Sequence, residues 1–149
     1  MSLGGYFDIL ILPRGGEKLL DIKLEKQLRV ITPDEPGIFG RVLGTLANAG
    51  VNLKALCIHS DQNEGIFLLL TSNPEKAESA LKALGYGVNI ENVVVAIVED
   101  RIGSGAEIGA LLGNAIIDVV YCYGSTTESG KALVVFQTSD NAKAIDTLR

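Results

Sequence analysis

The chain has 149 residues, of which 47% are hydrophobic, 21% charged and 5% aromatic, and its formal net charge at pH 7 is −5. This composition supplies enough apolar residues for a buried core and excludes a mostly disordered chain, and the acidic balance argues against a surface that binds nucleic acid through its phosphates. No apolar run reaches the roughly 18 residues of a membrane span, two cysteines make no disulfide framework, and no secretory signal is recognisable. We therefore expect a cytoplasmic protein that binds neither membranes nor nucleic acid.

The first 26 residues read as an added segment. Residues 1–5 resemble an expression leader, and residues 7–12 form an apolar run that lacks the basic flank of a secretory signal. After a turn of proline and glycine, apolar residues alternate with polar ones from Leu20 to Val30, with a single break at Lys26. This period of two predicts a long strand with one buried face. We expect residues 1–26 to lay an extra strand on the sheet of the domain that follows.

From residue 27 onward the chain contains an internal repeat. An offset of 66 positions matches residues 29–37 with 95–103 and residues 46–49 with 112–115. After one inserted residue near Gly130, an offset of 67 matches residues 71–72 with 138–139. Matches in the same order at several separate segments are hard to obtain by chance. The sequence therefore predicts two copies of one unit, residues 27–92 and 93–149.

Each copy is predicted to run strand, helix, strand, strand, helix, strand. In the first copy the strands are expected at residues 27–32, 51–60, 66–71 and 87–91. An apolar stripe between Ile38 and Ala49 predicts the first helix, which Gly50 ends, and Asn73 and Pro74 begin the second helix. This order predicts an α+β, ferredoxin-like βαββαβ fold, with two helices on one face of an antiparallel sheet.

The second copy stops at the end of its second helix, so its fourth strand is missing. An unpaired sheet edge invites aggregation. We therefore expect another chain or another element to cover this edge, and the apolar residues 7–12 are one candidate.

The residues around the first predicted turn resemble a known family. Residues 30–38, together with residues 49–53 after the helix, are similar to the ACT domain. The resemblance covers residues 26–149 as two tandem copies, as in small stand-alone tandem ACT proteins. It implies a non-catalytic regulatory protein, without a cofactor, that binds an amino acid or similar small metabolite where ACT units pair side by side. It also implies a homodimer and a regulated enzyme or transcription factor as partner.

The resemblance places the ligand against the turn after the first strand, the start of the first helix and the start of the second strand. In the first copy these positions hold Asp34, Glu35, Gly37, Ile38, Phe39, Asn52 and Leu53. In the second copy they hold Asp100, Arg101, Gly103, Ser104, Gly105, Asp118 and Val119.

The chemistry of these positions suits an amino acid. The unpaired N–H groups and partial positive charge of a helix N-terminus suit a carboxylate, Gly37 and Gly103 let the backbone approach a ligand, and acidic Asp34 and Glu35 attract an ammonium group. The alternative is a purely structural role, in which Asp34 caps the turn or helix and Gly37 permits the turn.

The two copies differ at these positions. Asn52, which both donates and accepts hydrogen bonds, is replaced by Asp118, and Glu35 is replaced by Arg101. An ionised Asp118 would repel a carboxylate, whereas Arg101 could anchor one through a bidentate pair. We hypothesise that the two sites are not equivalent and that the first copy keeps the more family-like pocket.

Glycines recur at every fourth position along the first helix of the second copy, and each costs about 1 kcal/mol relative to alanine. They are Gly105, Gly109 and Gly113, where the first copy has Phe39, Leu43 and Ala47. One interpretation is a groove for a ligand. The favoured interpretation is compensation, in which Tyr121 and Tyr123, in place of Ala55 and Cys57, fill the space from the sheet. Compensation requires both tyrosines to face this helix.

Other chemistry has less support. Cys57 and His59 lie two residues apart on one strand, but no further His or Cys with zinc spacing accompanies them. The chain has no nucleophile-elbow motif, no phosphate-binding loop and no dinucleotide fingerprint. We therefore expect no metal and no catalytic residue, and an enzyme would have to depend on His59. The main alternative is a protein–protein interaction module that regulates an enzyme or transcription factor without binding a ligand.

Overall fold

The computed structural model describes residues 21–149, which form six strands and four helices. The strands are β1 (Asp21–Pro33), β2 (Leu53–Asp61), β3 (Glu64–Thr71), β4 (Gly87–Glu99), β5 (Val119–Thr126) and β6 (Lys131–Thr138). The helices are α1 (Ile38–Asn48), α2 (Pro74–Lys82), α3 (Ser104–Asn114) and α4 (Asn141–Leu148). The predicted α+β class and the βαββαβ order of elements are confirmed.

The chain folds into two compact units. The first unit comprises residues 25–93, and the second unit comprises residues 94–149 together with the start of β1 up to Leu24. Strands β1 and β4, each 13 residues long, therefore continue from one unit into the other. The strand order is β2-β3-β1-β4 in the first unit and β1-β4-β6-β5 in the second. Both orders are those of a ferredoxin-like sheet.

The start of β1 supplies the strand that the second copy lacks. Ile22 is only 7% exposed and belongs to the buried cluster of the second unit, together with Val94, Ala96 and Ile108. The predicted open edge is thus covered by an element of the same chain, which comes from the N-terminal side of the repeat. Residues 7–12, the candidate named from the sequence, lie outside the described residues.

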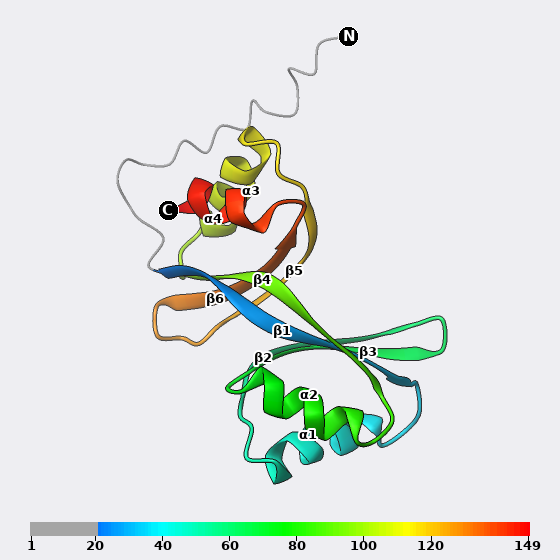
Figure 1. Cartoon of the computed structure of the whole chain (residues 1–149). Helices are drawn as coiled ribbons and strands as arrows, with labels where there is room; N and C mark the ends of the chain where they lie inside the picture. The colour runs from blue at the N-terminus through cyan, green and yellow to red at the C-terminus, as the bar shows by residue number, and fades with distance from the viewer. Residues whose placement is uncertain (1–20) are drawn as a thin grey trace. The chain divides into compact units, whose positions relative to one another are not determined.

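The first helix ends and the second helix begins where the sequence predicts. Asn73 accepts a hydrogen bond from the Lys76 N–H group at 3.0 Å, and Asp140 caps α4 in the same way. Gly50, with φ of +69°, follows the end of α1. In Figure 1 α1 lies beside α2, and α3 lies beside α4. The buried core of each unit lies between its helix pair and one face of its strands.

The tyrosines of β5 do not face α3, so the predicted compensation is wrong. Cys122 lies opposite Phe136 of β6, and Phe136 belongs to the buried cluster that includes residues of α3 and α4. Because directly paired residues of antiparallel strands share a face, Cys122 points toward the helices. Its neighbours along the strand, Tyr121 and Tyr123, therefore point to the opposite face.

A local irregularity explains the error. The pairing of β5 with β6 shifts between Val119 and Tyr121, and the pairing of β2 with β3 shifts between Leu53 and Ala55. An extra residue in one strand interrupts the alternation of side chains. Residues beyond the shift therefore lie on the face opposite to the one that a regular strand would give them.

Candidate functional site

The turn from β1 to α1 brings five of the predicted residues together, from Asp34 to Phe39. The backbone N–H group of Asp34 donates to the carbonyl oxygen of Asn63 at 3.3 Å, which places the turn beside the β2–β3 hairpin. Gly37 precedes α1 with φ of +88°, and no side chain caps the helix. Asp34 therefore does not cap α1, and the left-handed conformation favours glycine at position 37.

The same turn recurs in the second unit with more side-chain contacts. The backbone N–H group of Asp100 donates to the carbonyl oxygen of Gly130 at 2.9 Å, and Gly103 has φ of +95°. The hydroxyl group of Thr126 donates to the Asp100 carboxylate. Asp100 is thus held against the β5–β6 hairpin through both its backbone and its side chain.

Not every predicted residue of the first turn is accessible. Ile38 is buried in the core of the first unit, whereas Phe39 is 54% exposed at the start of α1. A ligand at this turn would therefore meet the ring of Phe39 and not the side chain of Ile38.

The start of the second strand lies at the other end of each unit. The backbone N–H group of Asn52 donates to the Ser72 hydroxyl at 3.0 Å, and the Asn52 carbonyl accepts from the Ser72 N–H group at 2.9 Å. Asp118 makes the same two contacts with Ser139, also at 3.0 and 2.9 Å. These bonds hold Asn52 and Asp118 where β3 and β6 end.

One unit therefore holds its turn and the residue before its second strand at opposite ends, although Gly105 and Val119 of the second unit line one groove between α3 and β5. The eight-residue strand β3 runs from the hairpin beside the turn to the residue before Ser72. Its eight residues are separated by seven steps of about 3.3 Å, so the strand is roughly 23 Å long. A small ligand cannot touch both the turn and Asn52 of the same unit.

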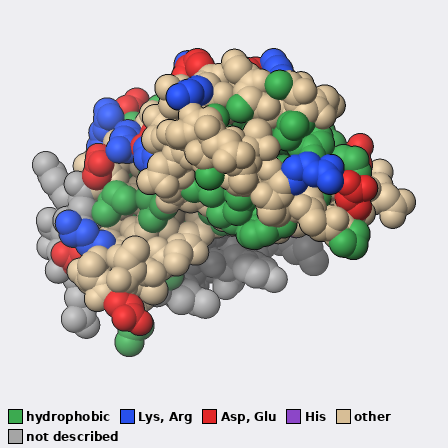
Figure 2. All heavy atoms as spheres, turned by 90° about the horizontal axis from the view of Figure 1, so that it is seen from below, with side chains coloured by type: hydrophobic (Ala, Val, Ile, Leu, Met, Phe, Trp, Pro, Cys, Tyr) green, Lys and Arg blue, Asp and Glu red, His purple; other side chains and the backbone are tan. Residues whose placement is uncertain are grey.

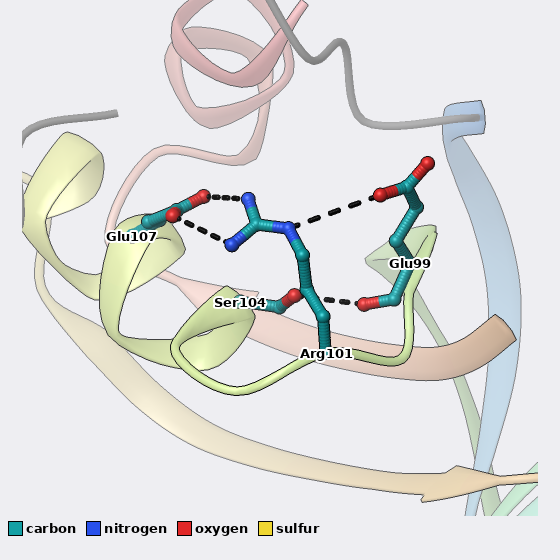
Figure 3. A network of polar contacts seen from close by, with 4 residues as sticks. All are labelled: Glu99, Arg101, Ser104 and Glu107. Atoms are coloured by element: carbon teal, nitrogen blue, oxygen red, sulfur yellow. Dashed lines mark hydrogen bonds and ion pairs between the residues drawn. The ribbon is translucent and has the colours of Figure 1, made fainter. Parts of the chain in front are cut away.

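An ion pair crosses each turn, and its charges are exchanged between the units. In the first unit the Glu35 carboxylate lies 3.7 Å from the Arg41 guanidinium. In the second unit Arg101 donates to both carboxylate oxygens of Glu107, at 2.8 and 2.5 Å (Figure 3). The repeat offset of 66 matches position 35 with 101 and position 41 with 107. Sequence reasoning missed Arg41 and Glu107, although the same offset continued into the helix would have revealed them.

The environment of Arg101 is strongly acidic. Its Nε atom lies 3.8 Å from the carboxylate of Glu99, and the hydroxyl group of Ser104 donates to the Glu99 carbonyl oxygen at 2.8 Å (Figure 3). The hydrogen bond from Arg101 lowers the pKa of the Glu107 carboxyl below its usual 4.5, because it stabilises the ionised form. A ligand carboxylate at Arg101 would have to compete with Glu107.

The described part of the chain offers no other obvious centre of chemistry. Within residues 21–149, no group of three or more His, Cys, Asp or Glu side chains is placed to hold a metal ion. No helix in this range has the length and apolar composition needed to cross a bilayer. On the face drawn in Figure 2, basic and acidic side chains lie near one another, and no continuous surface of one sign is visible.

Comparison with known proteins agrees with this architecture. The ACT domain pair family matches residues 24–148. Protein BT0572 from Bacteroides thetaiotaomicron superposes with a TM-score of 0.80 and 31% identity, over 85% of this chain and 88% of that one. No protein of curated function matches the sequence significantly.

Two further solved structures share the fold. They are the regulatory subunits of aspartate kinase from Thermus thermophilus and Thermus flavus, with TM-scores of 0.63 and 0.62 and identities of 14% and 16%. Each match covers 89% of this chain and 97% of the other. The tandem ACT organisation expected from the sequence is confirmed, and the chain belongs to the ACT domain pair family.

Proposed function

We propose that this protein is a non-catalytic regulatory protein that binds an amino acid or a similar small metabolite where two ACT units pair. The observation that carries the proposal is the separation of the predicted ligand residues. Each unit presents a turn at one end and Asn52 or Asp118 at the other, so each unit offers two half-sites.

Pairing along the edge strands would complete a site. Strand β2 is the outermost strand of the first unit, and its C-terminal end lies at the hairpin beside the turn. When two β2 strands pair antiparallel about a twofold axis, the start of one strand lies beside the end of the other. Asn52 of a second copy would then approach the turn at Asp34, and a homodimer would contain two such sites.

The first unit offers the groups that an amino acid needs. The N-terminus of α1 has no side-chain cap, so N–H groups of its first turn can donate to a carboxylate, and Asn52 can add an amide donor. The Glu35 side chain is half exposed, and its 3.7 Å contact with Arg41 is longer than a hydrogen bond, so its carboxylate is accessible to an ammonium group. The second unit is less suited, because Glu107 already binds Arg101 and because Asp118 is acidic.

The regulatory role is also supported by the solved structures of the same fold. Two of them are regulatory subunits of aspartate kinase. We propose by analogy that ligand binding to this protein changes its contact with an enzyme or a transcription factor.

A thermal-shift screen against the standard amino acids at millimolar concentration tests the proposal, since a ligand of the native state raises Tm. Calorimetry with the best ligand then compares Asn52→Ala with Asp118→Ala. We expect Asn52→Ala to abolish most of the binding and Asp118→Ala to change it little. Equal losses would contradict the inequivalence of the units. If no amino acid raises Tm, the protein is better described as an interaction module without a ligand.

A further inference from the structure

We infer that the second unit is an order–disorder element, a part of the fold that opens and closes while the first unit stays folded. Opening releases the start of β1 together with residues 94–149. This opening needs no ligand and no second copy, so it does not depend on the proposed function. Three differences between the units lead to it: the way the chain closes each sheet, the size of each core and one strained residue.

The chain closes the two sheets differently. The first unit is one continuous segment, residues 25–93, which supplies all four of its strands. The second unit takes its fourth strand from the start of β1, and the whole first unit lies between this strand and residue 94 in the sequence. If the first unit unfolded alone, it would become a long loop whose ends must stay together, at an entropic cost that grows with loop length. The first unit can therefore fold without the second, whereas the second depends on the first.

The two shared strands each have an exposed residue where they pass from one core to the other. In β1, Ile22 is 7% exposed in the second core, and Leu24, its neighbour on the same face, is 49% exposed. In β4, Asn92 is exposed between Val88 of the first core and Val94 of the second. Within the part of β1 that belongs to the second unit, Ile22 is the one buried residue that the structure describes. The start of β1 can therefore leave the second core without uncovering the first.

The core of the second unit is smaller at matched positions. The side chains that become smaller, from first to second unit, are Leu28 to Val94, Val30 to Ala96, Ile38 to Ser104, Leu43 to Gly109, Ile58 to Gly124 and Phe67 to Val134. Those that become larger or more apolar are Thr32 to Val98, Val42 to Ile108, Val51 to Ile117, Leu69 to Phe136, Glu78 to Ile145 and Val88 to Ile22. Three of the gains add a single methylene group, whereas the losses include two whole side chains and an aromatic ring. The second core therefore buries less apolar surface and gains less stability from burial.

Ile116 weakens the second unit further. It follows α3 with φ of +58°, and 89% of its surface is exposed, so packing does not offset the strain of a β-branched residue in this conformation. The first unit has Gly50 at the matched position, where the lack of a Cβ removes this strain. Opening of the second unit frees Ile116 to adopt an ordinary conformation.

An element that opens below the free energy of global unfolding can respond to binding. A molecule that binds only the closed second unit holds it closed, and a molecule that binds the released strands holds it open. The first unit is then the constant part of the protein, and the second unit is the part that responds.

The test is native-state hydrogen exchange of the full chain at a series of low urea concentrations. We expect amides of α3, α4, β5 and β6 to exchange through an opening of lower free energy and smaller urea slope than amides of α1, α2, β2 and β3. A smaller slope means that less surface becomes exposed in that opening.

Two matched variants test the order of opening. Leu46 and Leu112 occupy equivalent positions in α1 and α3, and each is 1% exposed. Leu112→Ala should speed exchange about tenfold or more in both units, because opening of the first unit includes opening of the second. Leu46→Ala should speed exchange far more in the first unit than in the second.

The inference is overturned if the amides of both units share one free energy of opening and one urea slope, because the chain then unfolds as a single unit. It is also overturned if the first unit opens at the lower free energy. Exchange in the unchanged protein distinguishes these outcomes by itself, so the test holds even where a variant does not fold.

Discussion

The first and second units keep the same backbone contacts but have exchanged many side chains. Gly37 and Gly103 have the same left-handed conformation before α1 and α3. Asn52 and Asp118 make the same two hydrogen bonds, each to the serine that comes directly after β3 or β6. By contrast, the ion pair across the turn has reversed its charges. The residue type is the same in both units where the backbone conformation depends on it, as at Gly37 and Gly103. It differs where another pair of side chains makes an equivalent contact.

One position departs from this pattern. Gly50 follows α1 with φ of +69°, but the second unit has Ile116 there, with φ of +58° and 89% of its surface exposed. A β-branched residue is disfavoured in this conformation by about 1–2 kcal/mol. The second unit thus contains a strained residue at a position where the first unit has glycine.

The largest expected effect tests whether the start of β1 serves the second unit. Ile22→Ala should lower the free energy of unfolding by about 2–4 kcal/mol, because it removes a buried side chain from the core. Hydrogen exchange should become faster in α3 and α4 than in α1 and α2. Leu24→Ala, at a residue that is 49% exposed, is the control and should have little effect. Faster exchange mainly in α1 and α2 would contradict this assignment, because it would show that Ile22 stabilises the first unit.

Exchanging the residue types at Gly50 and Ile116, which come after α1 and α3, should give the next largest effect. Ile116→Gly should stabilise the second unit by about 1 kcal/mol, and Gly50→Ile should destabilise the first by about 1–2 kcal/mol, because of the positive φ at both positions. Urea denaturation monitored by circular dichroism measures both changes. If Ile116→Gly lowers stability instead, Ile116 makes contacts that outweigh its backbone strain.

Reversing the charges of the second turn should give a smaller change, because exposed ion pairs contribute little. Arg101→Glu places a carboxylate near Glu99 and Glu107, and Glu107→Arg leaves two cations together, so each should lower Tm. The double variant restores the arrangement of Glu35 and Arg41 and should recover most of the loss. Additive losses in a double-mutant cycle would mean that the pair is not coupled.

The smallest effect is in the pH dependence. The lowered pKa of Glu107 means that its contribution to stability is present above the usual pKa of 4.5 and is lost as pH falls through the folded value. The difference in stability between the unchanged protein and Glu107→Gln should therefore be largest near neutral pH. A difference that grows as pH falls would contradict this assignment.

The first unit provides a comparison at high pH. The hydrogen bond between Lys26 and Glu75 raises the pKa of Lys26 above its usual 10.5 and lowers that of Glu75. The raised pKa contributes stability below 10.5 that is lost as pH rises through the folded value. The effect of Glu75→Gln should thus shrink at high pH, whereas that of Glu107→Gln should persist, since arginine keeps its charge. Equal behaviour of the two variants at high pH would contradict this difference.

Much of the fold could be predicted from the sequence, because the signals are local. The period of two before Val30, the capping residue Asn73 and the terminating Gly50 each act within a few residues of the element that they define. The repeat then carries the interpretation of the first copy over to the second. The same offset located both turns and the start of both second strands, which are the candidate ligand residues.

Tertiary structure decided what depends on residues distant in the chain. The alternation in β1 predicts a buried face, but only the folded structure shows that Ile22 is buried in the core of the second unit. A shift of register, which requires the partner strand, turned Tyr121 and Tyr123 away from α3. The partner of the Arg101 guanidinium is Glu107, which lies in the first turn of α3. In each case the sequence shows which residues the segment contains. Pairing and packing with another part of the chain decide which way a side chain points and which residue it contacts.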